Sequence, residues 1–247
     1  MMNTSIRTIL FIAILGFLCV SKVDVTQGQS QVAWSNFVNI SKTFTASSYP
    51  AMVADTSGKV HVVWSEDVGG ETQALVFRPD GSPRLDRRGR QVNFLWDLGN
   101  TLFYSSWDGN TWSTPVDIYT ALDSKVTYPQ VVVDAKGTIH LAWIQSQNEI
   151  VDLMYSQAPV EQAASVRAWT DPVILASQLS PDYYPVGLAV DQTDKLHILY
   201  YKYGQNPGVF VIHSTDGGNI WSDPIQIYAN NDPYGREDGS LPVRITS

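Results

Sequence analysis

Arginine side chains gather in one segment of the chain, between Glu66 and Asn100, which holds five of the nine arginines. A guanidinium group presents a planar fork of donors that suits a carboxylate or a sulfate group. The segment is therefore a candidate surface for an acidic ligand. A solvated polar loop is the alternative, because charge runs are usually just solvated. The five arginines are Arg78, Arg84, Arg87, Arg88 and Arg90.

Carboxylates and tyrosines stand together in other polar stretches of the chain. Aromatic rings beside carboxylates suit the binding of sugars, and paired carboxylates at set separations hydrolyse glycosidic bonds. The residues predicted to bind a ligand are Arg78, Arg84, Arg87, Arg88, Asp123, Asp182 and Tyr183. No catalytic residue can be assigned from the sequence.

A metal or cofactor has little support in the sequence. Asn230, Asn231 and Asp232, with Glu237 and Asp238, supply oxygen ligands for an alternative calcium site. No Gly-x-Ser-x-Gly, His-Glu-x-x-His, P-loop or dinucleotide motif occurs. We therefore predict no metal and no cofactor at the ligand site.

A threefold internal repeat must position these residues. Each copy begins with Tyr-Pro, continues through an apolar stretch to an Asp-rich turn, and then places one histidine in a second apolar stretch. The histidines His61, His140 and His197 are 79 and 57 residues apart. Self-similarity at a period near 50 residues in strand-rich sequence is typical of an array of sheets.

The Tyr-Pro pairs are Tyr49-Pro50, Tyr128-Pro129 and Tyr184-Pro185. We expect these tyrosines to serve the repeat rather than a ligand. We also expect each histidine to pack against a backbone partner rather than bind metal.

Four antiparallel strands are predicted in each copy. In the first copy they are residues 51–55, 60–64, 102–105 and 112–118, and the last is an edge strand because it contains Pro115. Such units, ordered from inner to outer strand, predict an all-β propeller. The predicted blades are residues 49–118, 128–175 and 184–228, with a closing strand at 34–40 and the start of a next blade at 241–246. Residues 29–247 then form one propeller domain of three complete blades and part of a fourth. We interpret this incomplete ring as a truncated gene product. Because it leaves sides of its blades exposed, we expect the protein to self-associate.

A second motif lies between the third and fourth strands of the repeat. The third copy reads Ser214-x-Asp216-x-Gly218-x-x-Trp221, and the first has a shorter form with Ser106, Asp108, Gly109 and Trp112. The carboxylate is expected to accept backbone N–H groups, glycine to supply a positive φ, and tryptophan to fill the gap between neighbouring sheets. This pattern resembles the Asp-box, or bacterial neuraminidase repeat, of the sialidase superfamily. In that superfamily the box is structural and lies away from the ligand.

The resemblance implies a carbohydrate ligand and leaves catalysis unsupported. Sialidases carry Arg-Ile-Pro near the first inner strand, where this chain has Ser48-Tyr49-Pro50. Their other two arginines and their Tyr/Glu pair come from later blades. The chain is therefore predicted to recognise carbohydrate without catalysis, and an exo-sialidase-type glycoside hydrolase acting on acidic glycans is the alternative.

The first residues predict secretion. Ile9 to Val20 is an apolar run too short to span a membrane, and residues 1–28 are typical of a cleaved signal peptide, with an uncleaved anchor as the alternative. The single cysteine, Cys19, lies within this segment.

A net charge of -8 argues against nucleic acid and anionic membranes as partners. We therefore expect an extracytoplasmic protein whose partner is a glycan or a cell-surface protein. The insertion and the interblade loops should share one face, opposite the Asp-boxes.

Overall fold

The computed structural model describes residues 36–43, 45–68, 74–75, 93–94, 99–122, 124–147, 150–179, 186–202 and 205–229. The chain divides into two units, Met1–Val38 and Asn39–Ser247. Every strand named below belongs to the second unit.

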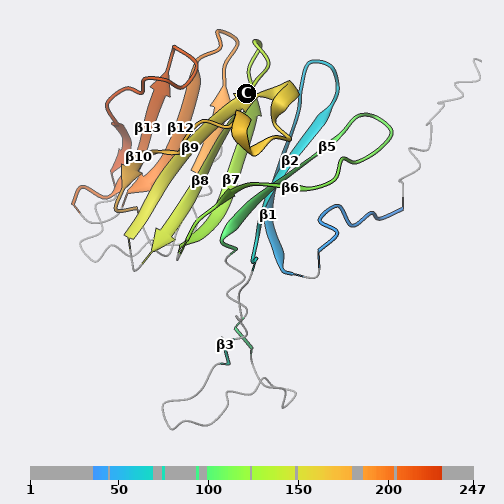
Figure 1. Cartoon of the computed structure of the whole chain (residues 1–247). Coiled ribbons are helices and arrows are strands. Elements are labelled where there is room, and N and C mark those ends of the chain that lie inside the picture. Colours follow the sequence, from blue (N-terminus) through green and yellow to red (C-terminus); the bar gives the residue numbers. More distant parts are fainter. Residues whose placement is uncertain are drawn as a thin grey trace, which may run out of the picture. The chain divides into compact units, whose positions relative to one another are not determined.

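Three four-stranded antiparallel sheets make up most of the described residues, and Figure 1 shows them in chain order from the blue-green first sheet to the orange third. The first contains β1 (Ser47–Ala54), β2 (Val60–Glu66), β5 (Thr101–Trp107) and β6 (Val116–Thr120). The second contains β7 (Lys125–Val133), β8 (Thr138–Gln147), β9 (Ile150–Pro159) and β10 (Val173–Ser177). The third contains β11 (Val186–Val190), β12 (Leu196–Lys202), β13 (Gly208–Ser214) and β14 (Ile225–Ala229). A two-stranded pair, β3 (Ala74–Leu75) and β4 (Asn93–Phe94), lies within the insertion.

Within each large sheet the spatial order of the strands is their order in the chain. The prediction of four-stranded antiparallel units is thereby confirmed. Helical structure in the described part of the chain is confined to two 3-10 turns, η1 (Val160–Gln162) and η2 (Val166–Ala168). Neither turn is long or apolar enough to cross a membrane.

The turn between the first two strands of each sheet is built by one aspartate. The Asp55 carboxylate accepts the backbone N–H groups of Ser57 at 2.8 Å and Lys59 at 3.0 Å. Gly58 closes this turn at a φ of 85°, a conformation that glycine adopts without steric cost. Asp134 and Asp191 make the same carboxylate–amide bonds in the second and third sheets. The repeated Asp turn therefore fixes each first hairpin.

Two apolar cores join successive sheets. One core brings Val63 and Leu102 of the first sheet against Leu141 and Trp143 of the second. The other brings Ile144 of the second sheet against Ile198 and other residues of the third. β8 contributes to both cores and is buried from Ile139 to Ile144, because a central strand between two neighbours has apolar residues on both faces.

The predicted ends of several strands were wrong. The outer strands begin after Pro115, Pro172 and Pro224 instead of including them, since proline has no N–H to donate to a ladder. The inner strands β1 and β7 begin before their Tyr-Pro pairs, which are absorbed as bulges.

The predicted N-terminal closing strand is not formed by residues 36–40, which are described and carry no strand. Phe37 in this stretch is fully exposed. An outer strand needs a sheet that lacks one, and each of the three described sheets already has its own. The start of a next blade, 241–246, lies outside the described residues.

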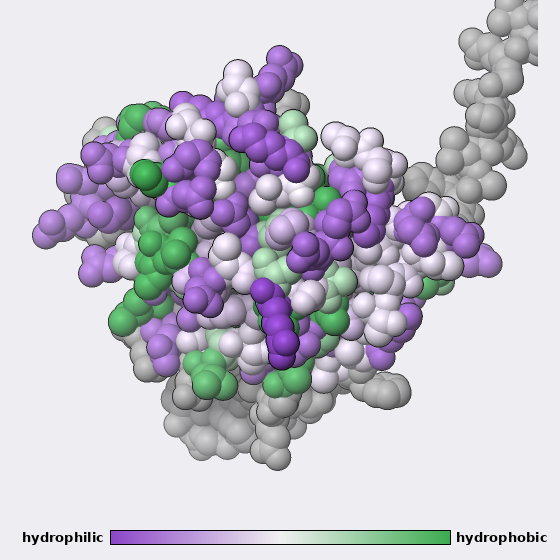
Figure 2. Space-filling model, turned by 45° about the horizontal axis from the view of Figure 1, so that its top comes forward, coloured by the Kyte–Doolittle hydropathy of each residue, from purple (hydrophilic) through white to green (hydrophobic). Residues whose placement is uncertain are grey.

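The face drawn in Figure 2 is largely hydrophilic, with hydrophobic side chains in several small groups. Exposed apolar residues of the described chain include Ile225, Ile227 and Tyr228, all on β14. This outer strand of the third sheet is exposed at every position.

Candidate functional site

The residues predicted to bind a ligand lie outside the described part of the chain. They are Arg78, Arg84, Arg87, Arg88, Asp123, Asp182 and Tyr183. The alternative calcium ligands, from Asn230 onward, lie outside it as well. Whether these side chains meet stays a prediction, and the described residues show what surrounds them.

Hydrogen bonds close the neck of the insertion, where the chain leaves β2 and returns to β5. Asn100 donates its backbone N–H to the Glu66 carbonyl at 3.1 Å. Its side-chain amide accepts from the Val68 N–H at 3.1 Å and donates to the Val68 carbonyl at 3.3 Å. The β2–β5 ladder therefore closes at Glu66 and Thr101. The insertion leaves the sheet at the end opposite the Asp55 turn.

The inner strands β1 and β7 carry matching irregularities at this same end. The ladder of β1 shifts register between Ser48 and Ala51, and that of β7 shifts between Thr127 and Gln130. Tyr49 and Tyr128 sit in these bulges, both with a φ of 52°. A left-handed conformation is unusual for an aromatic residue, and a following proline disfavours helical conformations further. Each bulge therefore holds a backbone conformation that costs about 1–3 kcal/mol.

The bulges bring the two tyrosine rings together. The ring centroids of Tyr49 and Tyr128 are 4.3 Å apart, with planes tilted by 41°. Both residues are half-buried. A bulge re-aims a side chain away from the normal alternation of a strand. Two half-exposed rings from neighbouring inner strands thus form one aromatic surface, which we call the tyrosine pair.

The tyrosine pair was missed as a site because its residues were assigned to the repeat alone. The available signal was the Tyr-Pro dipeptide itself, present three times at the start of an inner strand. The third copy, Tyr184-Pro185, lies outside the described residues.

A buried carboxylate stands next to the bulge of β1. Glu66 is fully buried and pairs with Ser47 in the β1–β2 ladder. It accepts the Trp64 indole N–H at 2.7 Å and the Ser47 hydroxyl at 3.2 Å, and also the Thr45 hydroxyl. With three donors and no exposed surface, this carboxylate holds the strand in place and is not open to a substrate.

The first two sheets are also tied together at this end. The Ser65 hydroxyl donates to the Val126 carbonyl of β7 at 2.5 Å. The Val126 N–H donates to the Gly99 carbonyl at 2.7 Å. A Cβ on Gly99 would overlap the backbone of Glu66 and the Ser65 side chain, so only glycine fits there. The tyrosine pair therefore rests on a rigid support.

The repeated histidines have side-chain partners, and the predicted backbone partner was wrong. His61 contacts the Tyr104 hydroxyl through Nδ1 at 2.7 Å and the Asp55 carboxylate through Nε2 at 3.1 Å. His140 contacts the Tyr155 hydroxyl at 2.7 Å, and its Nε2 lies 3.3 Å from the Asp134 carboxylate without hydrogen-bond geometry. The turn carboxylate lies close to each of these rings because the aspartate and the histidine belong to the same hairpin.

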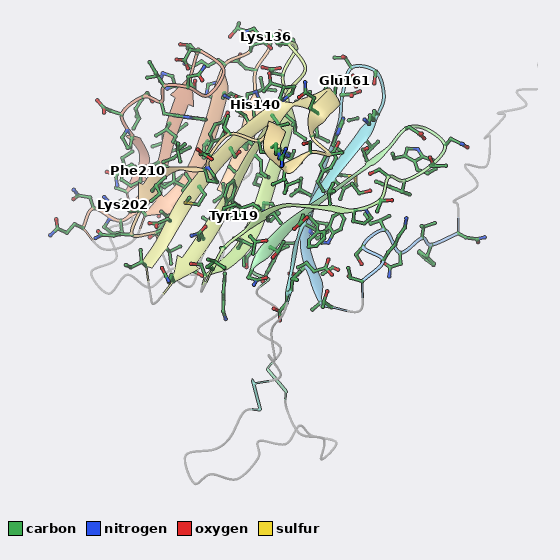
Figure 3. All side chains as sticks on the ribbon, in the orientation of Figure 1. Tyr119, Lys136, His140, Glu161, Lys202 and Phe210 are labelled. Carbon is green, nitrogen blue, oxygen red and sulfur yellow. The ribbon has the colours of Figure 1, made fainter. Side chains whose placement is uncertain are left out.

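The third copy of this arrangement is incomplete. His197 keeps its aspartate, Asp191, at 3.0 Å, but Val211 stands where the tyrosine would be. Figure 3 shows His140 below Lys136, the tip of its turn, at the end away from Lys202. The three histidines lie in three separate sheets. In the described part of the chain no group of three His, Cys, Asp or Glu side chains is arranged to hold a metal ion.

Burial and hydrogen bonding set the protonation of these groups. Burial lowers the pKa of His61 and of His140, and the neighbouring aspartate opposes this only in part. Burial tends to raise the pKa of Asp55, but hydrogen bonds from Ser57, His61 and the turn amides lower it to about 2. The histidines are therefore neutral and the aspartate is ionised at neutral pH.

The Asp-rich turns before the outer strands lie at the Asp55-turn end of the sheets, as the strand register requires. Asp216 accepts the N–H groups of Asn219 at 3.2 Å and Ile220 at 2.9 Å, and the Ser214 hydroxyl at 2.8 Å. Asp108 accepts from the backbone N–H groups of Asn110 and Thr111, and the backbone of Ser106 bonds to Ser113. Hydrogen bonds lower the pKa of both aspartates.

The tryptophans of these turns differ in what they contact. Trp221 meets Tyr155 of the second sheet edge-on, with ring centroids 5.1 Å apart, and its indole N–H donates to Gly218. Gly218, at a φ of 86°, lies so close that a Cβ would overlap the Tyr155 hydroxyl. Trp112 instead contacts Trp107 of its own sheet, with ring centroids 5.6 Å apart and planes tilted by 46°. Gly109 supplies the positive φ of the first turn.

No known protein family and no curated protein sequence matches this chain. Solved structures similar to it include a protein of unknown function from Dyadobacter fermentans, with a TM-score of 0.47 and 12% identity over 75% of this chain and 55% of that one. The intramolecular trans-sialidase from Ruminococcus gnavus has a TM-score of 0.47 and 12% identity over 74% of this chain and 55% of its own. An α-L-arabinofuranosidase from Podospora anserina has a TM-score of 0.40 and 15% identity over 74% and 51% of the two chains. The chain thus spans about half the length of these structures.

Proposed function

We propose that this protein is a secreted, sialidase-like propeller that recognises carbohydrate and does not cleave it. The observation that carries the proposal is the tyrosine pair, formed by Tyr49 and Tyr128 on neighbouring inner strands. The three described sheets are, in this proposal, successive blades, each ordered from inner to outer strand and packed through an apolar core.

Aromatic surfaces of this kind suit sugar rings. A sugar has apolar C–H faces that stack on an aromatic ring, while its hydroxyls remain available to polar groups at the rim. The insertion leaves the first sheet beside the bulge of β1. Its arginines, Arg78, Arg84, Arg87 and Arg88, would supply charge for an acidic glycan. The proposed ligand is therefore an acidic glycan with one ring on the tyrosine pair.

Two observations favour binding over hydrolysis. Ser48, in Ser48-Tyr49-Pro50, occupies the place where the Arg-Ile-Pro of sialidases has the arginine that grips the substrate carboxylate. Glu66, the carboxylate beside the bulge of β1, is fully buried and occupied by three donors. A glycosidase needs carboxylates that reach the bond to be broken. The proposal therefore predicts no release of a fluorogenic aglycone from a sialoside, and such release by the purified chain would overturn it.

Binding is tested by removing the rings while keeping the backbone. Asparagine tolerates the left-handed conformation better than most residues, so Tyr49→Asn and Tyr128→Asn remove the aromatic surface with little added strain. On a glycan array, the double variant should bind acidic glycans at least tenfold more weakly than the parent, as for loss of an aromatic anchor. Tyr228→Asn, at a tyrosine on β14 that is 48% exposed, is the matched control and should bind like the parent. Equal binding by the double variant would disprove the role of the tyrosine pair.

Secretion is proposed from the apolar run of residues 9–20. Expression in a host with a secretory pathway should yield a chain that begins near Gln29, as measured by mass spectrometry of the medium. A chain that keeps its first residues inside the cell would contradict this part of the proposal.

A further inference from the structure

The third sheet differs from the first two in the surroundings of its repeated histidine. In the first two sheets this histidine is fully buried, and its Nδ1 contacts the hydroxyl of Tyr104 or Tyr155. Its face of the strand packs on the following sheet, because Val63 and Ala142, two residues further on, belong to the cores shared with that sheet. No described sheet follows the third, and the His197 side chain is 29% exposed.

A second histidine lies directly opposite His197. His213 is its partner in the ladder of β12 and β13, which lie side by side in the orange third sheet (Figure 1). Residues directly opposite each other in an antiparallel ladder share one face, with Cβ atoms about 4.5–5.5 Å apart. The two ring centroids are 6.4 Å apart, and the ring planes are tilted by 40°. We call these two residues the histidine pair. The matching positions of the first two sheets hold Ser106 and Gln157 instead.

One nitrogen of each ring is already bonded. His197 Nε2 lies 3.0 Å from the Asp191 carboxylate. An ionised carboxylate only accepts, so Nε2 carries the proton and Nδ1 keeps its lone pair. His213 Nδ1 lies 3.2 Å from the Ser222 hydroxyl, which donates to the Asp223 carbonyl at 3.1 Å. A hydroxyl has a single proton, so Nδ1 is the donor in this contact and Nε2 of His213 keeps its lone pair.

Both of these lone pairs are open to solvent. His197 Nδ1 and His213 Nε2 have no hydrogen-bond partner among the described residues, and neither is among the buried atoms that lack one. In the first sheet the equivalent Nδ1 points to Tyr104 on the neighbouring strand, a position that Val211 holds in the third sheet. Because the contact of Nε2 with the turn aspartate is kept, the His197 ring has the same orientation. Its Nδ1 therefore faces β13, the strand that contains His213.

We propose that the histidine pair binds a divalent transition-metal ion such as Ni²⁺, Cu²⁺ or Zn²⁺. Imidazole suits these metals, whereas Ca²⁺ and Mg²⁺ prefer oxygen ligands. An ion bonded to a nitrogen at about 2.0–2.1 Å lies about 3.2 Å from the ring centre, half of the 6.4 Å between the two centroids. One ion can therefore reach both rings once they turn slightly toward each other.

The surroundings of the pair support this role. A carboxylate behind a ligand histidine fixes its tautomer and raises its basicity, and Asp191 stands behind His197 in this way. Two side chains are fewer than the three or four of most protein metal sites, so water would complete the coordination. The sequence predicted packing rather than metal binding for His197. The proposal departs from that expectation because the tyrosine that would occupy its Nδ1 is absent from the third copy.

The first test titrates Ni²⁺ into the full chain, without an affinity tag, by calorimetry. The chain has four histidines, of which His61 and His140 are fully buried, so the histidine pair provides the accessible imidazoles. One ion should bind per chain with a dissociation constant of about 1–100 µM, as expected for half the ligands of a four-ligand site. Mg²⁺ should not compete. Absence of binding below 1 mM, about tenfold weaker than this range, would overturn the proposal, as would one ion per two chains.

Four variants identify the ligands. His197→Gln and His213→Gln should each weaken Ni²⁺ binding at least tenfold, the effect of losing one of two ligands. Val211→Tyr returns to Nδ1 the hydroxyl that the first two sheets have, and should also weaken binding. Val211→Phe is its matched control, with the ring but not the hydroxyl, and should bind like the parent. Unchanged affinity in either histidine variant, or equal affinity of Val211→Tyr and Val211→Phe, would overturn the proposal.

NMR locates the metal without any variant. In long-range ¹H–¹⁵N spectra of the labelled full chain, Zn²⁺ should shift the ring nitrogens of His197 and His213, with the largest changes at Nδ1 of the first and Nε2 of the second. The rings of the buried His61 and His140 should stay unchanged. Zinc that binds without shifting either ring of the histidine pair would lie on carboxylates elsewhere, and the proposed site would be wrong.

Discussion

At the scale of single residues, the repeated sheets share buried polar contacts between aspartate, histidine and tyrosine side chains as well as apolar cores. Each Asp turn closes a hairpin, and in the first and third sheets its carboxylate also bonds the histidine of the next strand. In the first two sheets that histidine contacts a tyrosine hydroxyl as well. Because the aspartate is ionised, His61 donates to it through Nε2 and accepts from Tyr104 through Nδ1. The neutral imidazole is the form that satisfies both neighbours.

This arrangement predicts loss of stability in acid. Burial lowers the pKa of His61 below its ordinary 6.5, so the unfolded chain takes up the proton more readily and stability falls as pH drops below about 6.5. The pKa of Asp55, lowered from 3.8 to about 2, adds a further loss as pH falls from about 3.8 towards 2. Urea unfolding at pH 7.5, 5.5 and 4 should give a steadily decreasing free energy. A constant free energy of unfolding between pH 7.5 and 5.5 would contradict the predicted contribution of His61.

A single hydroxyl can be tested against a matched one. Tyr155→Phe leaves His140 Nδ1 without its partner and should lower the free energy of unfolding by about 1–3 kcal/mol, the cost of a buried unsatisfied group. Tyr200 is as deeply buried, but its hydroxyl makes no hydrogen bond among the described residues. Tyr200→Phe should therefore change the free energy of unfolding by less than about 0.5 kcal/mol. Equal effects of the two changes, measured by urea unfolding, would show that the histidine contact adds nothing.

At the scale of elements, the turn before β14 acts as a contact between sheets. Gly218 and Trp221 both meet Tyr155 of β9, which in turn holds His140 of β8. The third sheet is thus joined to the second through its turn as well as through the apolar core. The packing of the third sheet on the second therefore depends on the backbone conformation of this turn.

Two adjacent glycines separate backbone strain from packing. Gly217 and Gly218 both have a positive φ, 75° and 86°. A Cβ on Gly217 would meet nothing within 4 Å, whereas one on Gly218 would overlap Tyr155. Gly217→Ala should cost about 1 kcal/mol for the conformation alone. Gly218→Ala should cost a further ~1–3 kcal/mol for overpacking. Thermal unfolding that gives the same loss for both would rule out the contact with Tyr155 as a constraint.

The strands and their order were predictable because the signals are local. Asp55 and Gly58 mark a hairpin, and the apolar run from Val60 to Trp64 marks a buried strand. The bulge at Tyr49 was not predictable, since it depends on how β1 aligns with β2 and on the ring of Tyr128 in another sheet. The partner of His61 was missed for a similar reason, as Tyr104 is 43 residues away. The closing strand was predicted from the likeness of residues 34–40 to the outer strands, and this likeness specifies a strand only where a sheet lacks its outer strand, which none of the three described sheets does.

At the scale of the whole molecule, the outer strand of the third sheet is an exposed apolar edge. An edge strand presents unpaired backbone groups and invites pairing with a second copy unless charges protect it. β14 has Ile225 and Ile227 exposed and no charged residue along its length. The predicted self-association is therefore proposed to run through this edge.

Adding a charge to the edge should prevent association. Ile227→Lys should shift the concentration at which dimers form upward by about tenfold or more, measured by light scattering. Val166→Lys is the control, because Val166 and Ile227 are both 56% exposed but Val166 is not on an edge strand. A parent protein that stays monomeric at all concentrations, or equal effects of the two changes, would contradict an association through β14.

The hydrogen bonds between Asn100 and Val68 bear on how the insertion can evolve. Since the β2–β5 ladder ends before the insertion, the roughly thirty residues beyond it can be replaced without breaking a ladder hydrogen bond. Closing a loop costs free energy that rises only slowly with its length. Changes in the length and sequence of the insertion should therefore cost the sheet little free energy. A short glycine-serine bridge in place of residues 69–98 should fold about as stably as the parent, and under the proposed function it should lose the preference for acidic glycans.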